Sequence, residues 1–425
     1  MALTDTGPWL ARFLRIGLSA RGLGSVDGVG SASAPITRPT VAGIPVPVAT
    51  ELGIAEAVLD PNGGSSATVW QVRTEAGTRL VVKTLTERED LVDGHDLDTF
   101  TRKPGQVAAV HRELPGLSPY YTSVVGCWQG PGWAAYAMPR YEGRAVTLPL
   151  DGPRPDVDGF LRDLGAVLGV LTETGYARRS WPAAPDHFVT THLDRVGRRL
   201  PLLGRHLPAE LLRDRPIVVN GRRCRSLPRL LAELGANGTR LARLRPRRLA
   251  FPVHGDLNLG NLLVRRGFPD PEFTVLDPRG VLVPWDPVYD FAKSLFSLTA
   301  FERAITGGLR IGRTVRSGGY TVSFTDGRES YLAAAERFVP TLAELPYLRH
   351  LDQVDPDWRT RLRFAHACHY LAESACRLSD RRHRAYGEVR GWDACVLLST
   401  GLLLLGIRQL DELLDGSGPG LPSDP

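Results

Sequence analysis

The sequence predicts an α+β protein of two unequal lobes, a small β-rich N-terminal lobe and a larger, mainly helical C-terminal lobe that carries a β-hairpin. Runs rich in Val, Thr and Trp, which are typical of strands, dominate residues 51–142. From residue 143 onwards, apolar residues recur mostly at helical spacing. Two short apolar runs, at residues 261–264 and 273–276, interrupt this helical part on either side of a turn and predict the hairpin.

The length of 425 residues is sufficient for such a division. We assign residues 1–50 to an N-terminal extension and connector, residues 51–142 to the N-lobe and residues 143–415 to the C-lobe. Residues 416–425 are rich in Gly, Ser, Pro and Asp, and we expect them to form a disordered tail.

Composition argues against several classes of protein. Hydrophobic residues make up 43% of the chain and charged residues 23%, which is ordinary for a soluble globular enzyme. The net charge of +6 is modest, and no dense Lys/Arg run alternates with aromatic residues, so we expect no nucleic-acid partner. The longest uncharged apolar stretch, residues 394–407, is too short to span a bilayer. We therefore expect a cytoplasmic protein, a monomer or homodimer, with no membrane partner.

Lysine is rare in this chain, because Lys83, Lys103 and Lys293 are the only lysines among 52 basic residues. An ammonium and a guanidinium are not interchangeable at a crowded phosphate site, so each retained lysine is informative. Lys83 ends the Val-Val-Lys stretch within the β-rich run at residues 79–85, and a functional role is favoured over that of a solvated charge at a strand end. Lys293 fits either an ion pair close to a site or a surface charge.

The chain is organised around the segment that precedes and contains the hairpin. Gly255 and Gly260 disfavour a helix, so Asp256 to Asn261 should be a loop. One acid, Asp256, comes before the first strand, and another, Asp277, follows the second. Phosphoryl transfer needs a carboxylate near the acceptor hydroxyl and hard oxygen ligands for Mg²⁺. Asp256 can take the hydroxyl proton, while Asn261 and Asp277 can hold the metal.

The spaced set His-Gly-Asp-x-x-x-x-Asn and Leu-Asp, ending at Asp277, resembles the catalytic and metal-binding segments of the aminoglycoside phosphotransferase-like kinases, a family that includes choline kinase-like enzymes. Residues 285–292 resemble the family's Gly-Asp-Pro-x-Tyr-Asp-Leu-Ala segment, with Trp285 in place of Gly. The resemblance implies a protein-kinase-like fold, Mg²⁺ with ATP or GTP as donor, and the hydroxyl of a small molecule as acceptor. Asp256 would be the catalytic residue, and Asn261 and Asp277 the metal ligands.

The same resemblance implies that Lys83 contacts the nucleotide phosphates and is held by an acid from a later helix. A helix is expected over residues 106–114, and it should be short, because Pro115 follows almost at once. Glu113 near its end is the candidate partner of Lys83, and Glu89 is the second candidate.

Further parts of the family's nucleotide site can be carried over to this chain. The backbone around Pro139 and Tyr141 would form the hinge that meets the adenine. His254 would hold the catalytic loop in shape, and Asp290 would brace that loop from behind. A glycine-rich turn one strand before Lys83 would cover the phosphates with its backbone N–H groups; it consists of Asn62, Gly63, Gly64, Ser65 and Ser66.

The acceptor pocket is expected to involve Arg279, which departs from the family's usual small or aromatic residue and would contact an anionic acceptor or the transferred phosphate. His366, Tyr370 and Glu373 share one helical face and could line the same pocket. A metal site that adds His369 is the less favoured interpretation of this face. The excess of arginine favours a neutral or anionic acceptor, such as a sugar or sugar acid, over a polycationic antibiotic.

Two other functions remain open. A kinase-shaped pseudoenzyme that only binds a nucleotide or metabolite is disfavoured, because the catalytic positions are filled. A protein kinase would be expected to have Arg in the His-x-Asp loop and Asp-Phe-Gly after the hairpin. This chain has Gly255 and Asp277-Pro278-Arg279 at these places, so a small-molecule acceptor is favoured.

Overall fold

The computed structural model of the chain describes residues 40–41, 43–60, 66–89, 91–265, 272–314, 319–325, 329–379, 385–387 and 393–416. Most of the expected extension, the hairpin turn at 266–271 and the tail from 417 lie outside these residues. So do four members of the glycine-rich turn, namely Asn62, Gly63, Gly64 and Ser65.

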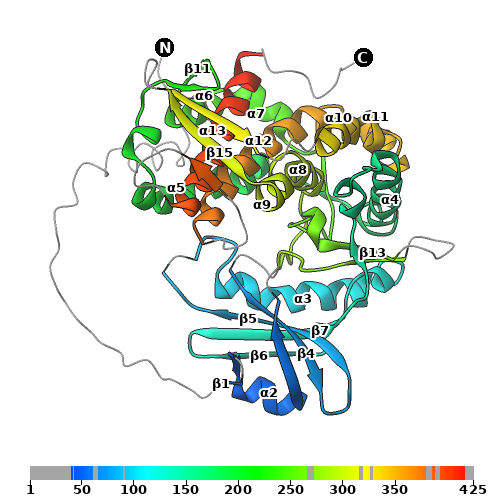
Figure 1. The fold of residues 1–425 in the computed structure, drawn as a ribbon. Coiled ribbons are helices and arrows are strands. Elements are labelled where there is room, and N and C mark those ends of the chain that lie inside the picture. Colours follow the sequence, from blue (N-terminus) through cyan, green and yellow to red (C-terminus); the bar gives the residue numbers. More distant parts are fainter. Residues whose placement is uncertain are drawn as a thin grey trace.

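The N-lobe is built on a five-stranded antiparallel sheet of order β3-β4-β5-β7-β6 (Figure 1). Along β5, Leu80 and Val82 pack with the buried face of α2, whereas Val81 and Lys83 alternate to the opposite face. Helix α2 falls in the region assigned to the connector, and it covers one face of the sheet. The bounds of these elements are β1 (Thr40–Val41), β2 (Ile44–Pro45), α2 (Val46–Leu52), β3 (Ile54–Leu59), β4 (Thr68–Thr74), β5 (Arg79–Thr86), β6 (Gly126–Gly130) and β7 (Trp133–Pro139).

Helix α3 (Leu97–Glu113) lies between this sheet and the helical lobe (Figure 1). Its first turn is capped by Asp96, whose carboxylate accepts the N–H of Thr99 at 2.7 Å. The sequence predicted a helix only over residues 106–114. The structure instead places Pro104 inside the helix, which begins at Leu97 and so brings about two and a half more turns to the interface between the lobes.

The C-lobe is centred on α8 (Val288–Phe296), α12 (Trp358–Cys376) and α13 (Ala394–Asp415). Every residue of α8 is buried. Helix α13 is long and apolar enough to cross a membrane by composition, yet 67% of its most apolar window is buried inside the protein. One such helix is weak evidence for a membrane span, because the core helix of a soluble protein has the same character.

The remaining helices surround this centre (Figure 1). Single turns of π-helix continue α4 and α8 and precede α5. The α-helices are α4 (Val157–Val170), α5 (Asp194–His206), α6 (Leu227–Ala236), α7 (Gly238–Leu244), α9 (Glu302–Thr306), α10 (Glu329–Ala343) and α11 (Pro346–Val354). The short helices are η1 (Ser118–Tyr120), η2 (Leu148–Leu150), η3 (Leu171–Tyr176), η4 (Val189–Leu193), η5 (Ala209–Leu211), η6 (Leu259–Asn261), η7 (Ser297–Phe301) and η8 (Arg377–Ser379).

The predicted hairpin is present as β13 and β14, and it forms a three-stranded sheet with β8 in the order β14-β13-β8. A second five-stranded sheet, of order β11-β10-β16-β15-β17, packs beside α13. The strands are β8 (Arg144–Ala145), β9 (Trp181–Pro182), β10 (Ile217–Val219), β11 (Arg222–Cys224), β12 (Arg248–Leu249), β13 (Leu262–Arg265), β14 (Glu272–Val275), β15 (Leu309–Thr314), β16 (Gly319–Phe324) and β17 (Ala385–Gly387). The predicted α+β two-lobe fold is confirmed.

Candidate active site

A cavity of about 940 Å³ lies where the sheet of the N-lobe, α3, the catalytic loop and α12 meet. Its lining combines apolar side chains of β5 and β7 with the polar side chains of the loop and hairpin. The structure thus brings together residues that are far apart in the sequence. The predicted site residues that line it are Ser66, Lys83, Pro139, Tyr141, Asp256, Asn261, Asp277 and Glu373.

The catalytic loop turns sharply at Gly255, which has a φ of +78°. A Cβ atom there would approach the Cβ of Arg279 to 2.9 Å and side-chain atoms of Trp285 and Val281 to 3.0 Å. Only glycine fits both this backbone conformation and this space. The turn directs Asp256 into the cavity, where its Oδ1 accepts a hydrogen bond from Asn258 at 3.2 Å.

His254 connects the catalytic loop to the end of the hairpin. Its Nε2 lies 2.9 Å from the carbonyl oxygen of Leu276, and its Nδ1 lies 3.2 Å from the backbone N–H of Asp256. The two contacts are satisfied together by a neutral ring that donates from Nε2 and accepts at Nδ1. Burial lowers the pKa of His254 to about 4, in agreement with a neutral imidazole at neutral pH. This geometry suits a residue that shapes the loop.

Asp290 lies behind the loop at the start of α8. Its carboxylate accepts the backbone N–H groups of His254 and Gly255, both at 2.8 Å, and the hydroxyl of Tyr176 at 2.6 Å. Burial raises the pKa of Asp290 to about 7, although these three hydrogen bonds favour the ionised form. Because two of the three donors are backbone groups of the loop, Asp290 determines where the loop lies.

Asp277 sits at the end of the hairpin with a φ of +54°, a left-handed conformation that is unusual for a residue other than glycine. Its Oδ1 is 2.7 Å from the Nζ of Lys103 and accepts the hydroxyl of Tyr136 at 2.8 Å, and its Oδ2 is 3.1 Å from the Nζ of Lys83. Burial alone would raise the pKa of Asp277, but the ammonium groups of Lys103 and Lys83 hold it far below its usual range. Asp277 is therefore ionised, as a metal ligand must be.

Lys103 and Gln106, one turn apart on α3, are site residues to which the sequence analysis assigned no role. The side-chain amide of Gln106 donates to the carbonyl of Val253 at 2.8 Å and accepts the N–H groups of Gly280 and Val281 at 2.6 and 2.7 Å. It thereby joins the catalytic loop to the backbone that follows Asp277. The rarity of lysine in the chain was the one feature of the sequence that singled out Lys103.

Glu113 does not hold Lys83, and this prediction was wrong. Glu113 lies at the far end of α3, where its carboxylate pairs with Arg112 at 2.6 Å and with Arg179 at 3.1 Å. The partner of Lys83 is Asp277. The longer helix explains the difference, because its N-terminal half lies over the cavity and presents Lys103 there in place of an acid.

Three of the residues proposed for the acceptor pocket lie outside the lining that the described residues form. Arg279 packs against Trp285, with its guanidinium 5.9 Å from the centre of the ring. The same guanidinium lies against Gly94, where a Cβ atom would collide with it. His366 lies 2.9 Å from the hydroxyl of Thr299, and burial lowers its pKa to about 3. Tyr370 packs edge-on against a core phenylalanine, so these two residues of α12 belong to the core rather than to the pocket.

Glu373 does line the cavity, and it lies next to Lys293. The Nζ of Lys293 is 2.8 Å from Oε1 of Glu373 and 3.1 Å from Oδ1 of Asp256, and its side chain is 2% exposed. Burial alone would raise the pKa of Asp256, but Lys293 holds it below the ordinary value, so the group is a carboxylate. Of the two interpretations of Lys293, the ion pair is correct, and all three lysines of the chain lie at this site.

The oxygen atoms around the hairpin suit a divalent metal ion. Asn261 donates from Nδ2 to the backbone carbonyl of Asp256 at 2.8 Å, which leaves its Oδ1 as an acceptor. Asn261 and Asp277 both line the cavity, and a carboxylate with an amide oxygen is a donor set that Mg²⁺ prefers.

Comparisons with solved structures give three likenesses. The chain is 11% identical to a putative fructosamine-3-kinase from Haemophilus somnus 129PT, with a TM-score of 0.45 over 84% of this chain and 91% of that one. It is 18% identical to an aminoglycoside-3'-phosphotransferase of type VIII (TM-score 0.41; 72% and 94% covered). It is 12% identical to the amicoumacin kinase hAmiN in complex with AMP-PNP, Ca²⁺ and Ami (TM-score 0.46; 87% and 92% covered).

No curated protein sequence matches the chain significantly. The model of the phosphotransferase enzyme family, APH, matches residues 58–323. This match spans more than half of the chain, from the first long strand of the N-lobe to β16, and it includes the catalytic loop and the hairpin. The chain therefore belongs to the phosphotransferase enzyme family.

Proposed function

We propose that this protein transfers the terminal phosphate of Mg-ATP, or Mg-GTP, to a hydroxyl group of a small molecule. The observation that carries the proposal is that Asp256, Asn261, Asp277 and Lys83 line one cavity, and that the neighbouring lysines lower the pKa of Asp256 and of Asp277, so that both acids are carboxylates. Met138, Pro139 and Tyr141 line the same cavity at the end of β7, where an adenine or guanine could lie. We also propose that the enzyme works in the cytoplasm.

In this reaction the acceptor oxygen forms a bond to the terminal phosphorus as the bond to the bridging oxygen breaks, and the nucleoside diphosphate leaves. Asp256 orients the acceptor hydroxyl and takes its proton. Lys83 and Lys103 bind phosphate oxygens, and Asn261 and Asp277 hold Mg²⁺, which supplies positive charge to the phosphates when it is bound. Because Asp256 is ionised at neutral pH, its carboxylate can accept the proton without a prior deprotonation.

Thermal unfolding tests the proposal without knowledge of the acceptor. Millimolar Mg-ATP or Mg-GTP should stabilise the protein by about 2.7 kcal/mol at a hundred times Kd, and excess EDTA should remove that gain. A screen of alcohols by release of the nucleoside diphosphate would then identify acceptors. Absence of any metal-dependent gain with either nucleotide would contradict the proposal. A gain with no turnover on any alcohol would favour the pseudoenzyme.

Lys103→Met should weaken the binding of Mg-nucleotide by ~10- to 100-fold, because one charged hydrogen-bond donor to the phosphates is lost. Methionine keeps the length and the packing of the side chain within α3. A titration with a fluorescent nucleotide analogue measures the effect. Glu113→Ala, on the same helix, is the matched control and should leave Kd unchanged, because Glu113 pairs with Arg112 and Arg179. The reverse pattern would restore Glu113 as the residue that supports Lys83.

A further inference from the structure

The backbone of the catalytic loop is bonded to one face of α8 and of the π-helical turn that continues it. Asp290 accepts two backbone N–H groups just before the reactive aspartate, as described above. The hydroxyl of Ser294 donates to the backbone carbonyl of Leu257 at 2.9 Å. The hydroxyl of Ser297 accepts the backbone N–H of Leu259 at 3.0 Å. These three positions, i, i+4 and i+7, share one side of a helix, so this face fixes the loop on both sides of its reactive residue.

Lys293 lies on the same face, three positions after Asp290, and it contacts the side chain of Asp256. The Nζ of Lys293 is 3.1 Å from Oδ1 of Asp256, and Asn258 donates to the same oxygen at 3.2 Å. Oδ2 of Asp256 accepts no hydrogen bond from any residue that the structure describes. One oxygen of the carboxylate is therefore held, and the other is available to an acceptor hydroxyl.

Lys293 lies behind Asp256 as seen from the cavity. The lining that the described residues form includes Asp256 but not Lys293, whose side chain is 2% exposed. A phosphate or an acceptor in the cavity would thus meet Asp256 rather than Lys293. Any effect of Lys293 on the reaction has to pass through the carboxylate of Asp256.

Glu373 of α12 is the second partner of Lys293. Its Oε1 lies 2.8 Å from the Nζ of Lys293 and also pairs with Arg195, and its Oε2 lies 3.3 Å from Arg377. These side chains are at most 3% exposed. A buried network whose members are paired in this way rigidifies the groups that belong to it. Glu373 therefore keeps the ammonium group of Lys293 at Asp256.

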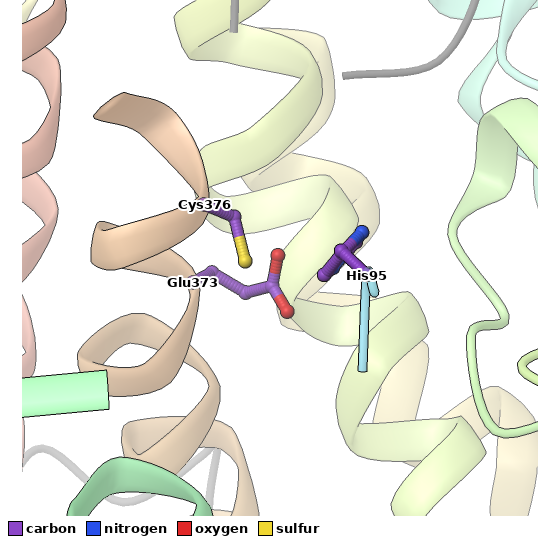
Figure 2. Close-up of side chains that lie close together, drawn as sticks. All are labelled: His95, Glu373 and Cys376. Atoms are coloured by element: carbon purple, nitrogen blue, oxygen red, sulfur yellow. The ribbon is translucent and has the colours of Figure 1, made fainter. Parts of the chain in front are cut away.

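A metal ion is the other partner that Glu373 could have. Figure 2 shows Glu373 with Cys376 and His95, and the potential ligand atoms of the three residues lie within 4.8 Å of one another. The oxygens of Glu373 already pair with ammonium and guanidinium groups, and the Sγ of Cys376 accepts from Nη1 of Arg199 at 3.0 Å. A metal ion at these atoms would lie next to those positive charges and would be repelled. Glu373 is thus the partner of Lys293 rather than a metal ligand.

We propose that Lys293, held by Glu373, is a positioning residue that orients Asp256 so that Oδ2 faces the acceptor hydroxyl and takes its proton. This inference rests on the proposed phosphotransferase function. A carboxylate that rotates freely presents a given oxygen to the acceptor for only part of the time, and a misplacement of about 1 Å can lower a rate by ~10²-fold. In this role Glu373 acts on the reaction through Lys293, which differs from a direct contact with the acceptor.

Lys293→Met should lower kcat by ~10- to 100-fold, while KM for the acceptor and Kd for Mg-nucleotide stay within about threefold of wild type. Methionine keeps the length of the side chain without the charge. The variant should fold, because Glu373 keeps Arg195 and Arg377 as partners and the side chain of Asp256 is 17% exposed. The measurement is steady-state turnover of the alcohol that gives the fastest release of nucleoside diphosphate in the screen, with a nucleotide titration.

A double-mutant cycle tests whether Glu373 acts through Lys293. Glu373→Gln alone should lower kcat by ~3- to 10-fold, because Lys293 loses the carboxylate that holds it. Added to Lys293→Met, the same substitution should change kcat by less than about twofold. A direct contact between Glu373 and the acceptor would instead raise KM and would multiply the two effects in the double variant.

Arg361→Met is the matched control for the loss of a buried, paired cation. Arg361 of α12 is 1% exposed, pairs with Asp286 at 2.6 Å and with Asp355 at 2.8 Å, and does not belong to the lining that the described residues form. This variant should unfold at a lower temperature than wild type but keep the wild-type kcat below that temperature. Circular dichroism and thermal unfolding report whether each variant is folded in the assay.

Two results would overturn the inference while the phosphotransferase function stands. One is a kcat of folded Lys293→Met within about threefold of wild type. The other is a fall in kcat for Arg361→Met as large as that for Lys293→Met, which would show a general effect of core ion pairs. If Lys293→Met does not fold, a wild-type kcat for Glu373→Gln overturns the inference. If wild type turns over no alcohol with either Mg-nucleotide, the proposed function fails and this inference fails with it.

Discussion

Asp256→Asn should lower kcat by ~10²- to 10⁴-fold while the affinity for Mg-nucleotide stays within a small factor of wild type. Asparagine keeps the shape of the side chain but cannot take the proton of the acceptor hydroxyl. The proposed contacts to the phosphates and the metal involve Lys83, Lys103 and Asp277, and the substitution leaves the ion pairs among these three residues in place. Lys293 also keeps a partner, because Glu373 lies 2.8 Å away, so the variant should fold.

The measurement is steady-state turnover with saturating acceptor, accompanied by a nucleotide titration. Asp158→Asn is the matched control, because this aspartate lies exposed in the first turn of α4 and pairs with a surface arginine, Arg337. A kcat for Asp256→Asn within about threefold of wild type would remove Asp256 from the reaction and point to a binding protein or a different base.

Asp277→Ala should have two large effects. The first is loss of the metal-dependent stabilisation by nucleotide, since the proposed charged metal ligand is gone. The second is a loss of stability of the free protein by about 3 kcal/mol, because Lys83 and Lys103 then lose the carboxylate with which both form ion pairs. Their side chains are 12% and 16% exposed, so solvent screens them in part and the lower end of the usual range applies.

A second substitution separates these effects. Lys103→Met added to Asp277→Ala removes one of the two unpaired charges and should recover a large part of the lost stability, without restoring the response to Mg-nucleotide. Chemical denaturation of the two single variants and the double variant measures the coupling. Equal stability of Asp277→Ala and wild type would show that the paired lysines do not depend on this carboxylate.

The catalytic loop and hairpin were predictable because local features of the sequence determine them. Gly255 permits the turn of the loop. Asn261 and Asp277 flank two short apolar strands that pair with each other, so the pairing of the strands brings these two residues together. The lobe boundary was visible for a similar reason, since strand and helix periodicities change near Pro139.

The contacts of α3 and α12 could not be predicted in the same way. Pro104 and Gly105 disfavour the interior of a helix, so a helical turn from which Lys103 could reach the cavity was not predictable. The sheet and the C-lobe hold that turn in place through tertiary packing, as Phe100 against Tyr136 shows. Helical periodicity placed His366 and Glu373 on one face of the helix. It could not predict that Glu373 lines the cavity whereas His366 lies in the core, because that depends on how α12 packs in the tertiary structure.

The placement of the lysines has a practical consequence for chemical labelling. The chain contains three lysines, and all of them contact an acid of the site, Asp277 for Lys83 and Lys103 and Asp256 for Lys293. An amine-selective acylating reagent thus has no other side chain to modify, apart from the α-amino group. Intact-mass spectrometry would count the acyl groups attached with and without a bound molecule. The difference between the two counts would report directly whether the cleft is occupied.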